Sequence, residues 1–369
     1  MKILVTGAKG FLGKNLIAEL KNTGYSEIFE FTRDTTSTEL EKYTRECNFV
    51  FHLAGVNRPQ DEKEFMEGNF GLTSQLLTLL NQHQNKAPIL ITSSIQAEQD
   101  HPYGRSKKAA EDLVAAYQRD TGVEVYMYRL PNVFGKWSKP NYNSVVATFC
   151  HNIARGLDIQ VNNPSAELNL CYIDDVLEEF KLALEGKPTV MDGFCTVPVS
   201  HPIKIGELAE LISSFKESRS DLYIPDMENA LTKALYSTYL SFLPEDQFSY
   251  DLTMHRDDRG SFTEFLRSRE RGQVSINVSK PSITKGDHWH HTKNEKFLVV
   301  SGKGVIRFRG IDCNKMIEYE VSGDKLQSVD IPPGYAHSIV NTGDRDLVTV
   351  MWANECFDAE KPDTYFLEV

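Results

Sequence analysis

The chain has 369 residues, of which 40% are hydrophobic and 25% charged, and its formal net charge is −12. This composition is typical of a globular protein with about two domains, and the negative charge argues against a nucleic-acid-binding surface. No apolar run approaches the roughly 20 residues that span a membrane. A first strand predicted from Lys2 leaves no room for a signal peptide, and six scattered cysteines without a CxxC pair indicate reduced thiols. We therefore expect a cytoplasmic protein with no membrane and no nucleic-acid partner.

The first sixteen residues carry the strongest pattern. Lys2–Thr6 is a short apolar run that predicts a buried strand, and Gly7, Gly10 and Gly13 follow it as a helical pattern begins. Glycines let backbone N–H groups approach a ligand, and the positive end of a helix dipole favours an anion. The pattern predicts a pyrophosphate-binding turn in a doubly wound, parallel α/β sheet. The alternative is an ordinary glycine-rich turn.

The second predicted strand, Ile28–Arg33, bears on the choice of cofactor. At its end, dinucleotide-binding folds usually present an acid to the adenine ribose, but this chain has Thr32 and Arg33. An arginine there can pair with a 2′-phosphate, which favours NADPH over NADH. Asp34 beside it weakens the inference, and a plain surface arginine is the alternative.

The next predicted elements lead to a polar strand end. A short helix is predicted over 36–48, a buried strand over Phe49–Leu53, a longer helix from about Glu64 to Asn81, and a strand over Pro88–Thr92. Ser94 lies just beyond the last strand. In an open parallel sheet, ligands bind at the C-terminal ends of the strands.

Tyr103 and Lys107 lie four residues apart at the start of a helix predicted to reach about Thr121, so they share a helix face. A neighbouring ammonium lowers the pKa of a phenol, and a tyrosine tuned in this way can give a proton to a carbonyl oxygen as hydride reaches the carbon. Ser94 can hydrogen-bond the same oxygen. An isolated pair of this kind is usually a surface pair, but its place after the glycine turn favours catalysis.

Taken together, these segments resemble the extended short-chain dehydrogenase/reductase family, in the branch that acts on nucleotide sugars. The matching segments, which cover roughly residues 1–243, are the three glycines, HLAG at 52–55, Ser94, Tyr103 and Lys107, RLPNVFG at 129–135 and YIDDV at 172–176. The resemblance implies a Rossmann-type domain with a catalytic triad of Ser94, Tyr103 and Lys107. It implies a nicotinamide cofactor bound by Thr6, Gly7, Gly10, Phe11, Leu12, Gly13, Leu53 and Lys107, and a UDP-sugar bound near Arg129 and Asn132. Arg33, from the argument above, joins the cofactor-binding set and makes NADPH the expected cofactor.

Two features depart from this family's pattern. The usual acid after the second strand is absent. Too few residues separate Arg33 from the HLAG segment for the strand that carries the family's adenine-facing Asp, so we expect one strand to be missing. Both departures concern the adenine side of the cofactor site.

The pattern changes near residue 245. Two helices are predicted over 203–243, and short β-like runs follow, separated by turn residues, at Gln273–Val278, Lys296–Val300, Gly304–Phe308, Met316–Val321, Val329–Ile331 and Leu347–Trp352. Such a series predicts a sandwich or barrel. We therefore predict two domains, 1–243 and 246–369.

The second domain carries a candidate metal site. His288 and His290 lie two apart on a predicted strand, so they point to the same face, and Glu295 and His337 could complete the set. Three imidazoles and a carboxylate suit Zn, Fe, Mn or Ni, and the sequence does not choose among them. His291 could replace His290, and a purely structural cluster is the alternative.

The segments HWHHTKNEKFLVVSG at 288–302 and PPGYAHSIVN at 332–341 resemble the two cupin motifs. The resemblance implies an all-β cupin barrel with a divalent metal bound by His288, His290, Glu295 and His337, and Zn²⁺ is our first choice for that metal. The second motif lacks its leading glycine, because Gly323 lies too far upstream. Some cupins, including sugar-nucleotide epimerases, work without metal. Cupins commonly pair, so we expect a homodimer.

A nucleotide-sugar reductase followed by a cupin resembles the capsular-polysaccharide enzymes of the CapF type. The resemblance implies that the cupin epimerises C3 of a UDP-2-acetamido-2,6-dideoxy-4-hexulose and that the first domain reduces C4 with NADPH. The product would be UDP-2-acetamido-2,6-dideoxy-L-talose, a precursor of N-acetyl-L-fucosamine. Since the C3 proton is acidic only while C4 is a ketone, epimerisation should come first. The HxH region and Tyr335 are the candidates for the epimerisation base.

Two alternatives remain at this point. The chain could be a reductase with a single activity, whose cupin serves dimerisation or sugar binding. It could also be an NADPH-sensing regulator on the same fold, but such a protein would be expected to lose Tyr103 or Lys107, and both are present.

Overall fold

A computed structural model of the protein describes residues 1–59, 61–311 and 315–369. The chain divides into two compact units, Met1–Ser213 with Asn229–Pro244 and Ser214–Glu228 with Glu245–Val369. The segment 214–228, which the sequence assigns to the first domain, therefore belongs to the second unit. The backbone explains this: the Ile224 N–H donates to the carbonyl of Arg267, and the Arg267 N–H donates to the carbonyl of Leu222. Five cysteines are free thiols, and Cys313 lies outside the described residues.

The first unit is built on a seven-stranded sheet of order β2-β1-β3-β4-β5-β9-β8. Its strands are β1 (Ile3–Thr6), β2 (Ile28–Phe31), β3 (Phe49–His52), β4 (Ile89–Ser94), β5 (Val125–Leu130), β8 (Val190–Met191) and β9 (Phe194–Cys195). Strands β1 to β5 pair in parallel, which confirms the predicted fold class. In the described residues, β2 is an edge strand of this sheet, because the chain between β2 and β3 forms one helix and no further strand.

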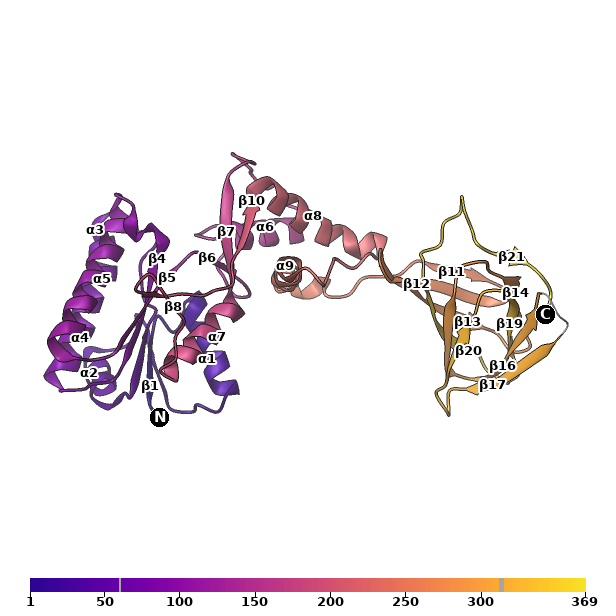
Figure 1. Cartoon of the computed structure of the whole chain (residues 1–369), viewed down its shortest axis with the longest axis horizontal. Coiled ribbons are helices and arrows are strands. Elements are labelled where there is room, and N and C mark those ends of the chain that lie inside the picture. The colour runs from indigo at the N-terminus through magenta and orange to yellow at the C-terminus, as the bar shows by residue number, and fades with distance from the viewer. Residues whose placement is uncertain (60, 312–314) are drawn as a thin grey trace. The chain divides into compact units, whose positions relative to one another are not determined.

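Helices cover both faces of this sheet (Figure 1). Helices α1 (Phe11–Asn22) and α7 (Ile173–Leu184) lie on one face, and α2 (Ser37–Glu46), α4 (Leu72–Gln82) and α5 (Pro102–Thr121) lie on the other. Successive strand residues face opposite layers, so Ile3 and Val5 pack into the first core and Leu4 into the second. Burial on both faces explains why these strands read as continuous apolar runs.

Shorter elements surround the sheet. The helix predicted over 64–81 is present but has three parts, α3 (Lys63–Phe65), the π-helical η1 (Met66–Gly71) and α4, and the turn η2 (Ile95–Glu98) precedes α5. A second sheet of order β10-β7-β6 consists of β6 (Asn132–Phe134), β7 (Glu167–Tyr172) and β10 (His201–Lys204). The remaining helices are α6 (Val145–Ala154), α8 (Ile205–Asp221), which passes from the first unit into the second, and α9 (Ala230–Leu240). In the described part of the chain, we find no helix that is long and apolar enough to cross a membrane.

The second unit is an all-antiparallel, cupin-like β domain made of two sheets. One has the order β11-β12-β13-β20-β15-β18 and the other β17-β16-β19-β14-β21. After the short turn η3 (Glu245–Gln247), the strands are β11 (Met254–Asp257), β12 (Gly260–Ser268), β13 (Gly272–Ser279), β14 (Thr284–Trp289), β15 (Glu295–Ser301), β16 (Lys303–Gly310), β17 (Met316–Ser322), β18 (Ser328–Ile331), β19 (Tyr335–Asn341), β20 (Leu347–Ala353) and β21 (Tyr365–Phe366). The apolar core contains Phe297 of one sheet and Ile306 and Ile339 of the other, as expected when two sheets pack face to face.

Candidate functional site

The strand order of the first unit creates a crevice at its centre. Strands β2 and β3 flank β1 on opposite sides, so the connections that leave β1 and β3 diverge at the C-terminal edge of the sheet. Gly7 and Gly10 follow β1, and Leu53 and Gly55 follow β3. All four residues line one cavity of about 790 Å³.

The glycines of this turn are required by close contacts. Gly7 has a φ of +70°, and a Cβ there would lie 2.9 Å from the backbone of Ala54. A Cβ on Gly13 would lie 2.3 Å from the carbonyl oxygen of Gly7. Helix α1 starts after Gly10 without a side-chain cap and without an acidic residue in its first turn. A phosphate at this helix start would therefore meet no competing carboxylate.

A buried polar network holds the segment after β3. The hydroxyl of Thr73 donates to the carbonyl of Asn69 at 2.5 Å, so its oxygen accepts from Nε2 of His52 at 2.9 Å. Nδ1 of His52 then accepts from the Thr6 hydroxyl at 2.8 Å, while the Thr6 oxygen accepts from the Ala54 N–H at 3.1 Å. Burial lowers the pKa of His52 to about 3, so the imidazole is neutral.

The predicted triad comes together in this cavity. Ser94 ends β4, Tyr103 lies in the first turn of α5, Lys107 lies one turn later, and all three line the cavity. Lys107 is buried, and its Nζ donates to the carbonyl of Thr92 at 3.2 Å. Burial lowers the pKa of Lys107 to about 8, against the opposing charge of Glu111. A Cβ on Gly55 would lie 3.1 Å from this Nζ, so the glycine of HLAG leaves room for the lysine.

The predicted effect on the tyrosine is wrong for this structure. Burial raises the pKa of Tyr103, and a hydrogen bond with Ser94 only partly opposes the shift. The reason lies in the position of Lys107, whose Nζ is 5.9 Å from the centre of the Tyr103 ring and is directed to the Thr92 carbonyl. Tyr103 is therefore held as a protonated phenol, which is the form that donates a proton.

The residues predicted to bind the cofactor fall into two groups. Gly7, Gly10, Phe11, Leu12, Gly13, Leu53 and Lys107 line the cavity. Thr6 lies beneath it and supports the His52 network. Arg33 is not among the lining residues. Lys9 and Lys14 line the cavity, but our sequence prediction did not include them, although they lie within the glycine turn and its helix.

The two predicted substrate residues have different positions. Asn132 lines the cavity, as do Trp137, Tyr142 and Asn143 from the loop before α6, a loop that carries no recognisable motif. Arg129 does not line it, and its predicted contact with substrate needs correction. Side chains alternate along β5, so Arg129 points away from the side of Leu130 and forms an ion pair with Glu111.

The predicted metal ligands of the second unit also come together. His288 lies on β14, His337 on β19, Glu295 at the start of β15 and His290 on the connection between β14 and β15. Their candidate ligand atoms all lie within 4.8 Å of one another. His291 does not join them, because its exposed ring packs against Trp289 and Tyr365.

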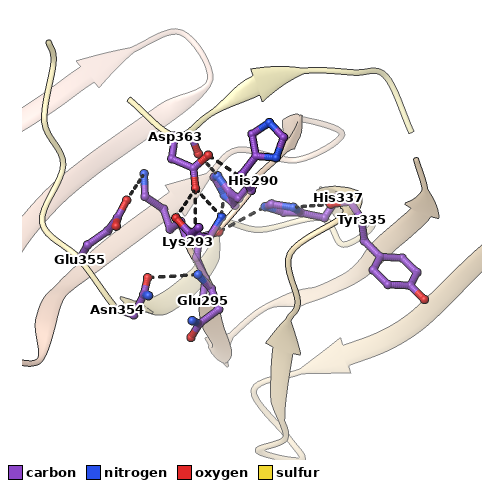
Figure 2. Close-up of polar contacts among 11 residues, drawn as sticks. His290, Lys293, Glu295, Tyr335, His337, Asn354, Glu355 and Asp363 are labelled. Atoms are coloured by element: carbon purple, nitrogen blue, oxygen red, sulfur yellow. Dashed lines mark hydrogen bonds and ion pairs between the residues drawn. The ribbon is translucent and has the colours of Figure 1, made fainter. Parts of the chain in front are cut away.

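Three buried atoms of this cluster lack a hydrogen-bond partner: Nε2 of His290, Nε2 of His337 and Oε2 of Glu295. The two nitrogens lie 3.4 and 3.3 Å from that oxygen (Figure 2). Unsatisfied polar atoms are costly in a buried place, and these converge on one point. The donor set and its unpaired atoms therefore fit a divalent metal ion.

The electrostatics of the cluster favour metal-binding protonation states. Burial acts to raise the pKa of Glu295, but the imidazoles of His290 and His337 lower it, with a net value of about 2. Burial, followed by the neighbouring imidazoles, lowers the pKa of His288 to about 4. An ionised carboxylate and a neutral imidazole are the forms that bind metal.

Two of these residues open onto a second cavity. His288 and His337 line a space of about 510 Å³ together with Lys285, Arg256 and Arg259. The Nζ of Lys285 donates to Oδ1 of Asn277 at 2.8 Å and to the carbonyl of Val278 at 2.9 Å. Tyr335 does not line this cavity: it points away from the cluster in Figure 2, and its ring packs near Phe308. This position argues against Tyr335 as the epimerisation base.

Comparisons with known proteins agree with the division of the chain into two units. Residues 3–191 match the NAD dependent epimerase/dehydratase family, and residues 255–365 match the polysaccharide biosynthesis C-terminal domain. The chain is 49% identical over its whole length to a UDP-2-acetamido-2,6-beta-L-arabino-hexul-4-ose reductase of Pseudomonas aeruginosa, of which it covers 99%.

Solved structures extend the similarity to both units. The crystal structure of the capsular polysaccharide assembling protein CapF from Staphylococcus aureus is 57% identical, with a TM-score of 0.95 and complete coverage of both chains. A UDP-glucose 4-epimerase from Thermotoga maritima has a TM-score of 0.54 over 66% of this chain at 19% identity, which supports the fold of the first unit.

Proposed function

We propose a function from the premise that this chain belongs to the NAD dependent epimerase/dehydratase family, as a CapF-type member with a polysaccharide biosynthesis C-terminal domain. The proposed activity is that of an NADPH-dependent UDP-sugar 4-ketoreductase with a C3-epimerase activity. Its substrate would be a UDP-2-acetamido-2,6-dideoxy-4-hexulose and its product UDP-2-acetamido-2,6-dideoxy-L-talose. The curated relative that matches the full chain is named as a reductase of such a 4-keto sugar.

The observation that carries the reductase is the meeting of Ser94, Tyr103 and Lys107 in the cavity that begins at the glycine turn. NADPH, when bound, supplies the hydride. Tyr103 would donate its proton to the C4 oxygen, and Ser94 would hydrogen-bond that oxygen. The ammonium of Lys107 would supply a positive charge near these two side chains. The phosphates would lie against Gly7, Gly10 and Gly13.

The preference for NADPH rests on charge at the end of β2. Arg33 follows the strand, and the acid next to it, Asp34, is paired with Lys9 at 2.7 Å. A 2′-phosphate would therefore meet cations, since the Asp34 charge is compensated.

The epimerase half would use the cavity beside the histidine cluster. His288, His290, Glu295 and His337 would hold a divalent metal, of which Zn²⁺ is our choice, and the metal would supply Lewis-acid chemistry. Lys285 brings a positive charge to the cavity wall, which stabilises the negative charge that develops when the C3 proton leaves. Because that proton is acidic only beside a ketone, epimerisation would precede reduction. The homodimer expected from the sequence stays a prediction.

The test is turnover of the 4-keto UDP-sugar with NADPH in D₂O, with the product analysed by NMR. We expect oxidation of NADPH and deuterium at C3. Oxidation of NADPH with ordinary hydrogen at C3 would support the alternative, a single reductase whose cupin has another role. No turnover would contradict the substrate assignment.

Two full-length variants separate the steps. Tyr103→Phe should leave NADPH unoxidised but still introduce deuterium at C3 of the ketone, whereas His288→Asn should lose the deuterium. Deuterium found only in reduced product would contradict the proposed order.

A further inference from the structure

The connection between two candidate metal ligands is held by a distant part of the chain. Residues 291–294 link His290 to Glu295, and the C-terminal segment from Asp363 onward lies against them (Figure 2). Both oxygens of the Asp363 carboxylate are used. Oδ1 accepts from the N–H of His291 at 2.9 Å, and Oδ2 accepts from the N–H groups of Thr292 and Lys293 at 2.7 and 2.8 Å.

The backbone of the same residue orients one ligand. The carbonyl oxygen of Asp363 forms a short hydrogen bond with Nδ1 of His290. A carbonyl can only accept, so Nδ1 carries the proton and Nε2 has the free lone pair. Nε2 is the atom that lies 3.4 Å from Glu295. Fixing the tautomer and the ring through the other nitrogen is how proteins prepare a metal-binding histidine.

The segment is also attached to the strand that carries His288. In the pairing of β21 with β14, Phe366 lies opposite His288 and Tyr365 lies opposite Trp289. One residue further, the Leu367 N–H donates to the carbonyl of Asp287 at 3.0 Å. The C-terminal segment therefore contacts the backbone on both sides of the His288–His290 pair.

A second side chain completes the support of the connection. Oδ1 of Asn354 accepts from the Asn294 N–H at 3.1 Å, and the Asn354 N–H donates to the Asn294 carbonyl at 3.1 Å. Asp363 and Asn354 together thus satisfy four successive backbone N–H groups, those of residues 291–294. A connection whose N–H groups are all satisfied from outside has little freedom to move its ligands.

We propose that residues 363–367 form a strap that presets the metal centre, with Asp363 as a positioning residue that is not itself a ligand. The inference rests on the metal site proposed above. Without the Asp363 carboxylate, three N–H groups of the connection would lose their acceptors, and the His290 ring and the Glu295 carboxylate would have to be ordered when the metal binds. That ordering lowers affinity, and loss of such supporting contacts typically weakens metal binding by about 10- to 100-fold.

The test measures Zn²⁺ affinity of the full-length protein by competition with a chromophoric chelator. We expect Asp363→Ala to bind Zn²⁺ about 10- to 100-fold more weakly than the unmodified chain. Asp363→Asn, which keeps one acceptor oxygen, should lie between them. Asp358→Ala is the matched control, because Asp358 is an exposed acid that precedes the strap and whose Oδ1 accepts from the Glu360 N–H.

Amide hydrogen exchange of the metal-free proteins provides the second measurement. Residues 291–293 should exchange faster in Asp363→Ala, whereas the strands of the first unit should be unchanged. Equal Zn²⁺ affinity in a folded Asp363→Ala would overturn the strap. If the unmodified chain binds no divalent metal, the metal site of the proposed function is itself wrong. That result differs from equal Zn²⁺ affinity of the two proteins, which would contradict only the strap. If Asp363→Ala does not fold, the Asp363→Asn comparison decides.

Discussion

Arg129 and Glu111 form a bidentate ion pair, with Nε 2.9 Å from Oε1 and Nη2 2.7 Å from Oε2. The Glu111 side chain is only 4% exposed and lies four residues after Lys107 on α5. Its negative charge acts on the lysine, because it raises the Lys107 pKa against the lowering effect of burial. The pair lies outside the reductase cavity and still affects the electrostatics within it.

Replacement of Glu111 by Gln should therefore shift the pH profile of reduction. Without the carboxylate, the Lys107 pKa should fall below its value of about 8, so the ammonium is lost at a lower pH. The alkaline limit of kcat/KM should move to lower pH, as measured from pH 6 to 10. Glu98→Gln is the control, because that carboxylate is 72% exposed and also pairs with Arg129. An alkaline limit that does not move would show that Lys107 does not set it.

Tyr103→Phe should abolish reduction while leaving cofactor binding intact. The phenol is the proton donor in the proposed reaction, and loss of such a group typically costs about 10²- to 10⁴-fold in rate. Single-turnover oxidation of NADPH measures the effect, and fluorescence titration measures binding. Tyr117→Phe changes a tyrosine on the same helix that packs against the core and should have little effect. A Tyr103→Phe variant with nearly full activity would require another proton donor.

Gly13→Ala should weaken NADPH binding, because the new Cβ would lie 2.3 Å from the Gly7 carbonyl and force the turn away from α1. Isothermal titration should show the loss of affinity. Gly24→Ala is a useful comparison: Gly24 has a φ of +94° but nothing within 4 Å of its Cβ position, so only local strain results. Tight binding by Gly13→Ala would mean that this close contact does not shape the cofactor site.

Thr6→Val tests the buried network beneath the same turn. The substitution leaves the Ala54 N–H and Nδ1 of His52 without their partner, and each unsatisfied buried group costs about 1–3 kcal/mol. In denaturant unfolding, the free energy of unfolding of the first unit should fall by about 1–3 kcal/mol or more. Thr78→Val on the exposed side of α4 should change it by less than about 0.5 kcal/mol. Similar values for both variants would show that the network does not contribute to stability.

Much of this protein could be predicted from local sequence. The order of elements around Gly7, the pairing of Tyr103 with Lys107 on one helix face, and the change to short strands near residue 245 all follow from periodicity and turn residues. Those signals are short-range, because the backbone geometry of one strand or one helical turn decides them. The set of His288, His290, Glu295 and His337 also followed from spacing and from its resemblance to the cupin motifs.

Tertiary structure alone decided the direction and partners of individual side chains. Arg129 belongs to a motif next to the cavity, yet the alternation of β5 turns it to the other side. Lys107 is close to Tyr103 in sequence, but its ammonium is directed to the Thr92 carbonyl, and burial of the phenol raises the Tyr103 pKa. Asp363 lies 73 residues from His290, and no local pattern marks it. Local sequence determines which element forms, whereas burial and long-range hydrogen bonds arise only when distant segments pack together.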